Sequence, residues 1–295
     1  MSTIHLNITQ ACNQKCFFCV RSMAPTQPPK LSTLVEYASA QRKKGATSCI
    51  ITGGEPFVSP FILDLLEAIK EQGYVRVTIQ TNAVLLSSQQ LVDAVRNICT
   101  GIRCDFSISL HTLNESLHEA ITGKRGHVEK IKKALNNLKT VGLPFCTNTV
   151  IFKRNVNQLK DISQYAYAAG AYLIQFSLMR YSAAVLAKDA VSLRIAREAA
   201  HAVGAIIPKE KIRFEGIPFC LLRGMERSVA EAYWPHELKL FTCTGKYIEN
   251  YKDDLMPQYR FKLPSCASCI MSSLCMGVWE EYKDDLISLS PKPIG

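Results

Sequence analysis

A strand-like run of apolar and β-branched residues, followed by a helix-like segment, recurs six times along the first two thirds of the chain. Each run is rich in the β-branched or aromatic residues typical of strands, and the segments between them have helical spacing. Alternation on this scale predicts parallel strands joined by right-handed crossovers. The six runs are TIHLNIT (3–9), SCIITGG (48–54), VRVTIQTN (75–82), CDFSISLH (104–111), FCTNTVIF (145–152) and YLIQFSLM (172–179).

The helix-like segments have recognisable ends. In the first of them, Thr33 lies three residues before Glu36, which is the spacing of a capping box at a helix N-terminus. Glycine follows several segments, as it does where a helix ends in a left-handed residue. Three helices are therefore predicted to close on a glycine: 32–45 on Gly45, 60–73 on Gly73 and 127–142 on Gly142.

The number of repeats indicates the fold class. Six strand–helix units, ending near residue 205, fall short of the eight in a closed barrel. We therefore predict an α/β fold, in which residues 1–205 form a partial (β/α)6 barrel of parallel strands. Functional residues are then expected at the carboxyl ends of the strands, where the following loops converge.

The alternation stops at about residue 206. Residues 206–295 mix prolines, aromatic residues and cysteines without a clear period. A small domain held together by a metal centre explains this composition better than a conventional apolar core. The sequence therefore predicts a C-terminal metal-cluster domain over residues 206–295.

Composition describes an ordinary folded protein, since 47% of the 295 residues are hydrophobic and 20% are charged. The N-terminus lacks the basic and apolar regions of a signal peptide. No run approaches the roughly eighteen apolar residues that a membrane-spanning helix needs. These features predict a cytoplasmic protein with no membrane partner.

The formal net charge of +10 permits an anionic substrate or a nucleic acid as a partner. The basic residues are scattered, however. Two basic groups, QRKK (41–44) and KIKK (130–133), fall in predicted helices, where a solvated helix face is the simpler interpretation. Thiolates bound to metal would also remove several positive charges.

Twelve cysteines are present, and they divide by spacing. In a reducing compartment, clustered cysteines more often ligate metal or carry out redox chemistry than form disulfides. Cysteines in apolar runs are more often small buried hydrophobes. One cluster is Cys12, Cys16 and Cys19, another is Cys266, Cys269 and Cys275, and between them lie Cys49, Cys99, Cys104, Cys146, Cys220 and Cys243.

The first cluster has the spacing C-x3-C-x2-C, with no fourth ligand nearby. Three such thiolates could belong to a structural zinc site completed from elsewhere, although zinc sites usually pair two short C-x2-C units. An iron–sulfur cube takes one ligand per iron, so three thiolates leave one iron open for a substrate or cofactor. On this interpretation the missing ligand is part of the function.

Two further features make this loop resemble the signature of the radical SAM family. Phe18 stands just before the third cysteine, and the sequence GGEP (53–56) ends the second predicted strand. The resemblance implies the partial barrel fold and a [4Fe-4S] cluster on the three cysteines, whose open iron binds S-adenosyl-L-methionine (SAM). It also implies reductive cleavage of SAM to a 5′-deoxyadenosyl radical that abstracts hydrogen from an organic substrate.

Cofactor contacts follow from the same resemblance, which assigns no catalytic residue. Phe18 would lie beside the adenine, and Gly53 and Gly54 would let the backbone approach the methionyl ammonium because they lack Cβ atoms. Glu55 would neutralise charge or orient the loop. For Asn148, a buried structural role is an equal alternative. The predicted cofactor-binding residues are Phe18, Gly53, Gly54, Glu55, Thr81, Asn82, Ser109 and Asn148.

The second cluster reads C-x2-C-x5-C and resembles the core of the auxiliary-cluster domains called SPASM and twitch, which follow the barrel in many radical SAM enzymes. The longer SPASM pattern continues with a cysteine where this chain has Trp279, which favours one auxiliary [4Fe-4S] cluster of the twitch type. A zinc site is the structural alternative. The implied ligands are Cys266, Cys269, Cys275 and, upstream, Cys220 or alternatively Cys243.

These features together predict a radical SAM enzyme that acts on a peptide side chain or a small carbohydrate-like molecule, with an auxiliary cluster assisting. An electron donor such as flavodoxin or ferredoxin is the implied partner. Two alternatives stay open. One is a radical SAM enzyme that modifies RNA, and the other is a zinc-binding interaction protein with two cysteine modules.

Other residues carry weaker expectations. Arg180, Tyr181 and Ser182 follow the sixth predicted strand, where substrate contacts are expected. The histidines considered lack the spacing of metal ligands and are predicted to be surface or cap residues. They are His5, His118, His127, His201 and His236.

Overall fold

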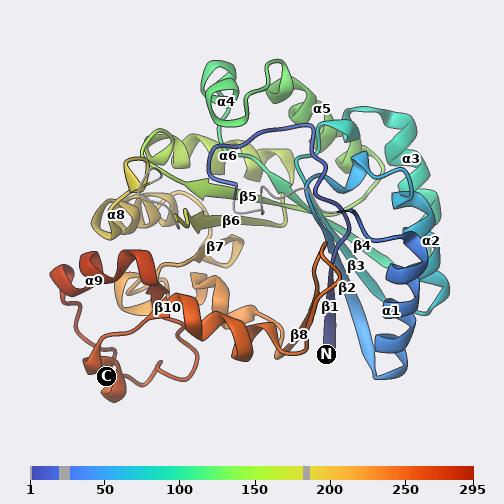
Figure 1. Cartoon of the computed structure of the whole chain (residues 1–295). Coiled ribbons are helices and arrows are strands. Elements are labelled where there is room, and N and C mark those ends of the chain that lie inside the picture. The colour runs from blue at the N-terminus through green and yellow to red at the C-terminus, as the bar shows by residue number, and fades with distance from the viewer. Residues whose placement is uncertain (1, 20–26, 182–186) are drawn as a thin grey trace. The chain divides into compact units, whose positions relative to one another are not determined.

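The computed structural model describes residues 2–19, 27–181 and 187–295 (Figure 1). The chain divides into two compact units, each made of several segments. The first unit comprises Met1–Ser109, His118–Cys146 and Pro235–Asp254, and the second comprises Leu110–Leu117, Thr147–Trp234 and Leu255–Gly295. None of the helices within the described ranges combines the length and the apolar content that crossing a membrane requires.

Parallel strands form the centre of the first unit. Four of them pair in sequence order: β1 (Ser2–Asn7), β2 (Ala46–Thr52), β3 (Arg76–Thr81) and β4 (Arg103–Ser109). On the other side of β1, β8 (Glu237–Phe241) pairs in parallel and β9 (Tyr247–Ile248) follows antiparallel to β8. The strand order within this unit is therefore β4-β3-β2-β1-β8-β9.

Most helices of this unit bury an apolar stripe, whereas one, the fourth along the chain, contacts the loop after β1 through Thr122 O. The helices are α1 (Leu31–Lys43), α2 (Ile62–Glu71), α3 (Gln89–Ile98), α4 (Glu115–Thr122, in this unit from His118) and α5 (His127–Thr140). The first three lie side by side along the sheet (Figure 1). Ile4 and Leu6 of β1 and Leu65 of α2 have no exposed surface. Each such side chain contributes about 1.5–3 kcal/mol of burial free energy.

The second unit has its own parallel strands. They are β5 (Phe145–Ile151, in this unit from Thr147), β6 (Leu173–Leu178) and β7 (Ile212–Glu215), and β6 pairs in parallel with β7. The helices α6 (Leu159–Ala169) and α8 (Leu193–Gly204) follow β5 and β6 along the chain. Phe176 and Phe214 are fully buried and stack with their ring centroids 5.4 Å apart.

The last part of the second unit has little regular structure. A ribbon of two-residue strands, β10 (Arg260–Phe261) and β11 (Val278–Trp279), is followed by the short helix α9 (Lys283–Leu289). The segment between β10 and β11 carries three cysteines, and no residue from 262 to 276 is buried. This segment therefore lacks an apolar core of its own.

The predicted α/β class with parallel strands is confirmed. All six predicted strands are present as β1–β6, each within two residues of its expected bounds. The predicted helix ends are also confirmed, because Gly45, Gly73 and Gly142 follow α1, α2 and α5 with positive φ angles of 95°, 80° and 75°. Glycine adopts this conformation without the strain that a Cβ atom would bring.

Two sequence predictions differ from the structure. The capping box at Thr33 is wrong, because α1 begins at Leu31 with Lys30 at the N-cap, and its first turn closes through Leu34 N and Lys30 O at 3.2 Å. The strand–helix region also does not end near residue 206. β7 and β8 lie beyond it, and both are too short for their sequence period to identify them.

The predicted domain boundary at residue 205 falls within the second unit, between α8 and β7. The two compact units are defined by contacts within the chain. β8, which lies in the sequence range predicted for the C-terminal domain, pairs with β1 of the first unit. The division into 1–205 and 206–295 describes expected roles and stays a prediction.

Candidate active site

Cys12, Cys16 and Cys19 lie in the loop after β1, at the carboxyl end of that strand. Their side chains are half-buried, and Gln14 N donates to Cys12 Sγ at 3.4 Å. An N–H donor to sulfur stabilises the thiolate, which is the form that ligates metal. Among the described residues, no three His, Cys, Asp or Glu side chains already stand at metal-holding positions, so ligation by these cysteines stays a prediction.

The GGEP segment at the end of β2 pairs with the chain just before the cysteines. Gly54 N donates to Thr9 O at 2.6 Å, and Glu55 N donates to Ala11 O at 2.9 Å. A Cβ atom at Gly53 would lie 2.5 Å from Thr9 O, which is too close for any side chain. Glycine is therefore required here for the approach of two strand ends, a reason that the sequence interpretation did not include.

Glu55 is 1% exposed, and its carboxylate accepts three hydrogen bonds. Oε1 accepts from Phe57 N at 3.1 Å and from Thr81 Oγ1 at 2.7 Å, and Oε2 accepts from Asn82 N at 2.7 Å. A buried carboxylate is costly unless it is hydrogen-bonded, and these bonds join the ends of β2 and β3. Of the two roles predicted for Glu55, these contacts support orientation of the loop.

Asn82 connects the end of β3 to the cysteine loop. Its Nδ2 donates to Asn13 Oδ1 at 2.6 Å and lies 3.9 Å from Cys12 Sγ. Its Oδ1 accepts from Val84 N at 3.1 Å, which fixes the orientation of the amide. Thr81 and Asn82, predicted as cofactor contacts, thus also support the residues around Cys12.

A buried polar group under the cysteine loop was not predicted from the sequence. Gln14 is 5% exposed, and its Nε2 lies 3.1 Å from His127 Nδ1 and 3.4 Å from His118 Nε2. The backbone of the same loop is bound to α4, since Lys15 N donates to Thr122 O at 2.8 Å. The loop is therefore held by α4 and α5 as well as by the sheet.

The prediction that all five histidines are surface or cap residues is wrong for His5, whose Nε2 is buried in β1, and for His118 and His127. His201 and His236 are exposed. His118 and His127 are 2% and 9% exposed and contact Gln14. Their burial follows from contacts between segments more than a hundred residues apart, which no local pattern indicates.

Three further predicted cofactor contacts lie at separate places. Phe18 is half-buried, with its ring centroid 5.2 Å from that of Phe17, and Ser109 is half-buried at the end of β4. Asn148 belongs to the second unit, where its Oδ1 lies 2.9 Å from Ser177 Oγ. The same hydroxyl lies 2.8 Å from Glu215 Oε2, so Asn148 is part of a polar row across β5, β6 and β7.

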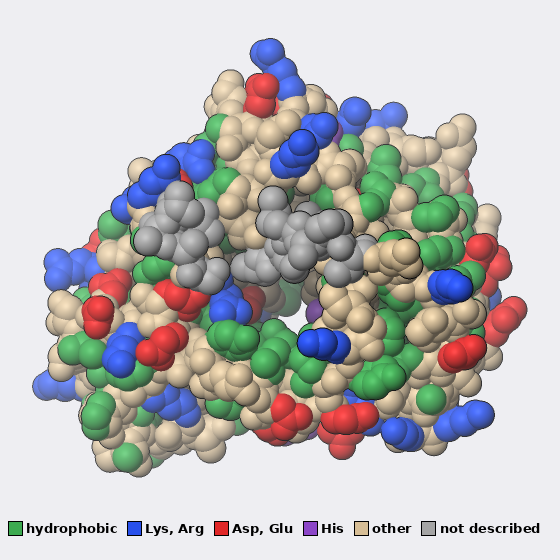
Figure 2. All heavy atoms as spheres, viewed as in Figure 1, with side chains coloured by type: hydrophobic (Ala, Val, Ile, Leu, Met, Phe, Trp, Pro, Cys, Tyr) green, Lys and Arg blue, Asp and Glu red, His purple; other side chains and the backbone are tan. Residues whose placement is uncertain are grey.

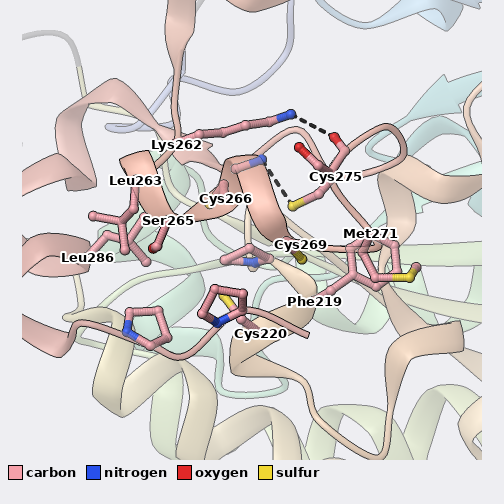
Figure 3. A pocket seen from close by; sticks show the side chains of 15 residues that line it. Phe219, Cys220, Lys262, Leu263, Ser265, Cys266, Cys269, Met271, Cys275 and Leu286 are labelled. Atoms are coloured by element: carbon pink, nitrogen blue, oxygen red, sulfur yellow. Dashed lines mark hydrogen bonds between the residues drawn. The ribbon is translucent and has the colours of Figure 1, made fainter. Parts of the chain in front are cut away.

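Four cysteines of the second unit line one pocket (Figure 3). Cys220 lies in a turn after β7, and Cys266, Cys269 and Cys275 lie between β10 and β11. Gly277 N donates to Cys275 Sγ at 3.3 Å, the dashed contact that ends on the Cys275 sulfur in Figure 3. The remaining lining is mainly apolar and includes Phe219, Leu263, Met271 and Leu286.

The two candidates for the upstream ligand belong to different compact units. Cys220 lines the pocket, and burial raises the pKa of its thiol to about 11, with the nearby Cys275 and Cys266 acting in the same direction. Cys243 belongs to the first unit, where Gln10 Nε2 donates to its Sγ at 3.4 Å. This arrangement favours Cys220 over Cys243, and the ligand assignment itself stays a prediction.

The residues expected near the substrate are only partly described. Tyr181 Oη donates to Glu281 O at 2.7 Å, and its ring meets that of Tyr282 edge-on at 5.2 Å. Arg180 contacts two aromatic rings in the same unit. Ser182 lies outside the described residues.

Curated relatives match the N-terminal part of the chain. One, named "Probable GTP 3′,8-cyclase", from Methanocaldococcus jannaschii, is 29% identical over 177 residues, which is 58% of this chain and 57% of the relative. Another of the same name, from Methanococcus maripaludis, is 31% identical over 177 residues, with the same coverage. The chain thus spans just over half the length of these relatives.

Solved structures resemble the chain along almost its whole length. Streptococcus suis SuiB bound to precursor peptide SuiA is 18% identical, with a TM-score of 0.69 over 94% of this chain and 71% of SuiB. The protein anSMEcpe with bound AdoMet is 14% identical, with a TM-score of 0.69 over 97% of this chain and 92% of that one. At these identities the likeness supports the fold alone.

The family is identified by a sequence profile. The profile described as "Radical SAM superfamily" matches residues 6–166, more than half of the chain. The matched range contains the cysteine loop after β1, the GGEP segment after β2 and Asn82 after β3, which the structure connects by hydrogen bonds. The chain belongs to the radical SAM superfamily.

Proposed function

We propose that this radical SAM enzyme abstracts hydrogen from an organic substrate, with Cys12, Cys16 and Cys19 holding its active cluster. When bound, a [4Fe-4S] cluster and SAM supply the reductive cleavage that yields methionine and a 5′-deoxyadenosyl radical. The observation that carries the proposal is the network that joins the cysteine loop to the ends of β2 and β3. An external electron donor such as flavodoxin or ferredoxin is required by this chemistry.

The residues around the cysteine loop fit this group. Gln14 N and Asn82 Nδ2 provide two N–H donors toward Cys12 Sγ, at 3.4 and 3.9 Å, as suits a thiolate that ligates iron. The loop offers three thiols and therefore leaves one iron for SAM. Glu55 and Gly53 hold the strand ends that position this loop.

A second [4Fe-4S] cluster, on Cys220, Cys266, Cys269 and Cys275, is the next part of the proposal. Four thiols around one pocket provide one ligand for each iron of a cube. The segment between β10 and β11 has no buried residue, which is expected where a metal centre replaces an apolar core. Four thiolates also suit tetrahedral zinc, and metal analysis distinguishes the two.

The substrate class proposed is a peptide side chain or a small carbohydrate-like molecule. One structural neighbour was solved with a precursor peptide, which motivates a peptide, although its identity of 18% supports the fold alone. RNA is the second candidate, motivated by the net charge of +10. Lysine and arginine side chains are spread among acidic ones on the face shown in Figure 2 rather than gathered in one patch, which favours the first candidate.

Formation of 5′-deoxyadenosine tests the proposal. The protein is reconstituted anaerobically with iron and sulfide, then incubated with SAM and a strong reductant. We expect 5′-deoxyadenosine from the parent and none from the Cys12→Ala/Cys16→Ala/Cys19→Ala variant. A Cys146→Ala variant, which removes a half-buried cysteine on β5, is the control and should retain product formation. Equal product from the triple variant, or none from the parent, would contradict the proposal.

A further inference from the structure

Trp279 lies between two arginines in the second unit. The guanidinium carbons of Arg260 and Arg180 lie 3.3 and 4.5 Å from the centroid of the Trp279 ring system. Arg260 and Trp279 face each other across the β10–β11 ribbon, and Arg180 follows β6 directly. Such stacking is favourable and orients each guanidinium plane.

This group lies at the carboxyl ends of β6 and β7. A Cβ atom at Gly216, the residue after β7, would lie 2.8 Å from Trp279 Nε1 and 3.0 Å from Leu178 Cβ at the end of β6. The carboxyl ends of parallel strands are where ligands bind in α/β folds of this kind. The position is therefore one at which a substrate is expected.

The donors of this group are buried and lack hydrogen-bond partners. The Arg260 side chain is 3% exposed and Trp279 is 4% exposed. Trp279 Nε1, Arg180 Nε and the Nε, Nη1 and Nη2 atoms of Arg260 make no hydrogen bond within the described part of the chain. A buried donor without a partner costs about 1–3 kcal/mol, and more when it is charged. Five such atoms around one ring indicate a missing acceptor.

Nearby carboxylates do not supply that acceptor. Arg260 Nη2 forms an ion pair with Glu231 Oε1 at 3.0 Å, but the pair is not aligned as a hydrogen bond, and the same oxygen accepts from Gly216 N at 2.8 Å. Glu281 Oε1 lies 3.7 Å from Arg180 Nε. Burial raises the pKa of Glu231, and the nearby Arg260 acts in the opposite direction. Glu231 Oε2 and Glu281 Oε2 are also buried and without a hydrogen-bond partner in the described part of the chain. These two acceptor atoms are fewer than the five unpartnered donor atoms of Arg260, Arg180 and Trp279.

We infer that Arg260, Arg180 and Trp279 bind an oxyanion of the substrate, either a carboxylate or a phosphate. The planar fork of a guanidinium matches the two oxygens of either group, and the indole N–H adds a third donor. This inference rests on the proposed function, because it places part of the substrate at the strand ends of a radical SAM enzyme. It narrows the substrate to an acidic peptide or a phosphorylated small molecule.

Equilibrium binding tests the inference without turnover. Isothermal titration calorimetry on the reconstituted protein, without SAM or reductant and at constant ionic strength, uses inorganic phosphate and N-acetylglutamate as separate probes. We expect at least one of them to bind with a dissociation constant in the millimolar range. Preference for phosphate indicates a phosphate-bearing substrate, and preference for the carboxylate indicates an acidic peptide.

Two conservative variants locate the binding. Arg260→Lys keeps the charge beside Glu231 but removes the fork, and Trp279→Phe keeps an aromatic ring but removes the donor. Each is expected to weaken binding about tenfold, which corresponds to the loss of one good hydrogen bond. Arg194→Gln, an exposed arginine of α8 in the same unit, is the control and should bind as the parent does. If thermal melting shows that one variant is unfolded, the other carries the test.

Parent-like binding by the folded variants would overturn the inference, as would the absence of binding of both probes to the parent at about 50 mM. These outcomes are independent of the proposed function, which depends on 5′-deoxyadenosine formation. A protein that binds phosphate through Arg260 but forms no 5′-deoxyadenosine would retain the oxyanion site and lose the proposed chemistry.

Discussion

The two cysteine groups of this chain are held by different means. Cys12, Cys16 and Cys19 lie in one short loop that the ends of β2 and β3 and the buried Gln14 fix from several sides. The second group joins Cys220 to a distant segment, 262–276, that has no buried residue and ends in strands of only two residues. The first loop is positioned by hydrogen bonds to the protein, whereas the second segment is proposed to depend on a metal centre bound by its cysteines.

This difference suggests how metal binding and folding are coupled in each unit. A loop that is already hydrogen-bonded to a sheet loses little structure when its metal is removed. A segment without an apolar core obtains much of its stability from the metal, so that binding free energy becomes folding free energy.

Loss of the second metal centre should unfold the segment around it. We expect the Cys266→Ala/Cys269→Ala variant to be cleaved by trypsin within residues 260–283 at least about tenfold faster than the parent, because a structural metal contributes several kcal/mol. Limited proteolysis with mass spectrometry measures this. The Cys12→Ala/Cys16→Ala/Cys19→Ala variant is the matched comparison and should leave cleavage in that segment unchanged. Equal rates of cleavage within residues 260–283 in both variants would contradict the proposed difference between the two cysteine groups.

A methyl group at Gly53 should displace the cysteine loop. In Gly53→Ala, the new Cβ lies 2.5 Å from Thr9 O, so the strand ends must separate. We expect a loss of about 1–3 kcal/mol in unfolding free energy and a fall in 5′-deoxyadenosine formation of more than about tenfold. Gly101→Ala is the control, because its φ is +89° but no atom lies within 4 Å of the added Cβ. If both variants lose product formation equally, backbone strain rather than the clash is responsible.

Removing the Gln14 side chain amide should loosen the loop without releasing its iron. Gln14→Ala leaves His118 and His127 without their shared partner, which should cost about 1–3 kcal/mol in unfolding free energy. We also expect a changed electron paramagnetic resonance spectrum of the reduced active cluster. Gln72→Ala, which removes a hydrogen bond to Val35 O elsewhere in the first unit, should alter stability but not the spectrum. An unchanged spectrum in Gln14→Ala would show that the amide has no influence on the cluster.

Stability should depend on pH through His5 in β1. Burial lowers the pKa of His5 to about 4, from an unfolded value of about 6.5. Below about pH 6.5 the unfolded chain therefore binds a proton at His5, whereas the folded protein binds it only near pH 4. The free energy of unfolding is therefore highest above about pH 6.5 and falls toward pH 4. We expect His5→Leu to reduce this loss by about 3 kcal/mol between about pH 7 and pH 4 in denaturant titrations. His236→Gln, which changes an exposed histidine of the same unit, is the control and should lose as much stability over this pH range as the parent. The same loss in His5→Leu would contradict the prediction.

What the sequence predicted here was local. The six strands and the closing glycines follow from short-range pattern, and the C-x3-C-x2-C loop and GGEP placed the same side chains at strand ends that the structure does. Contacts between distant segments were not predictable in this way. The burial of His118 and His127 around Gln14, the return of β8 to β1 and the choice between Cys220 and Cys243 all depend on tertiary packing.

The structure also gives some predicted residues a reason that the sequence does not contain. The resemblance implies that Gly53 allows an approach to the cofactor, whereas in the structure the backbone of Thr9 fills the space that a side chain would take. Trp279 was noted only as the place of an absent cysteine, and its contacts with Arg260 and Arg180 emerge from the fold. Residue type and spacing indicate which ligands a residue could bind, and tertiary packing decides which contacts it makes.

Iron content is the most direct test of the central claim that this chain has two separate cluster sites. Iron per chain is counted after anaerobic reconstitution in the parent, in Cys12→Ala/Cys16→Ala/Cys19→Ala and in Cys266→Ala/Cys269→Ala/Cys275→Ala. We expect about eight irons in the parent and about four in each variant, since each cube contains four. Four irons in the parent, none in the first variant and zinc bound at the C-terminal cysteines would contradict it.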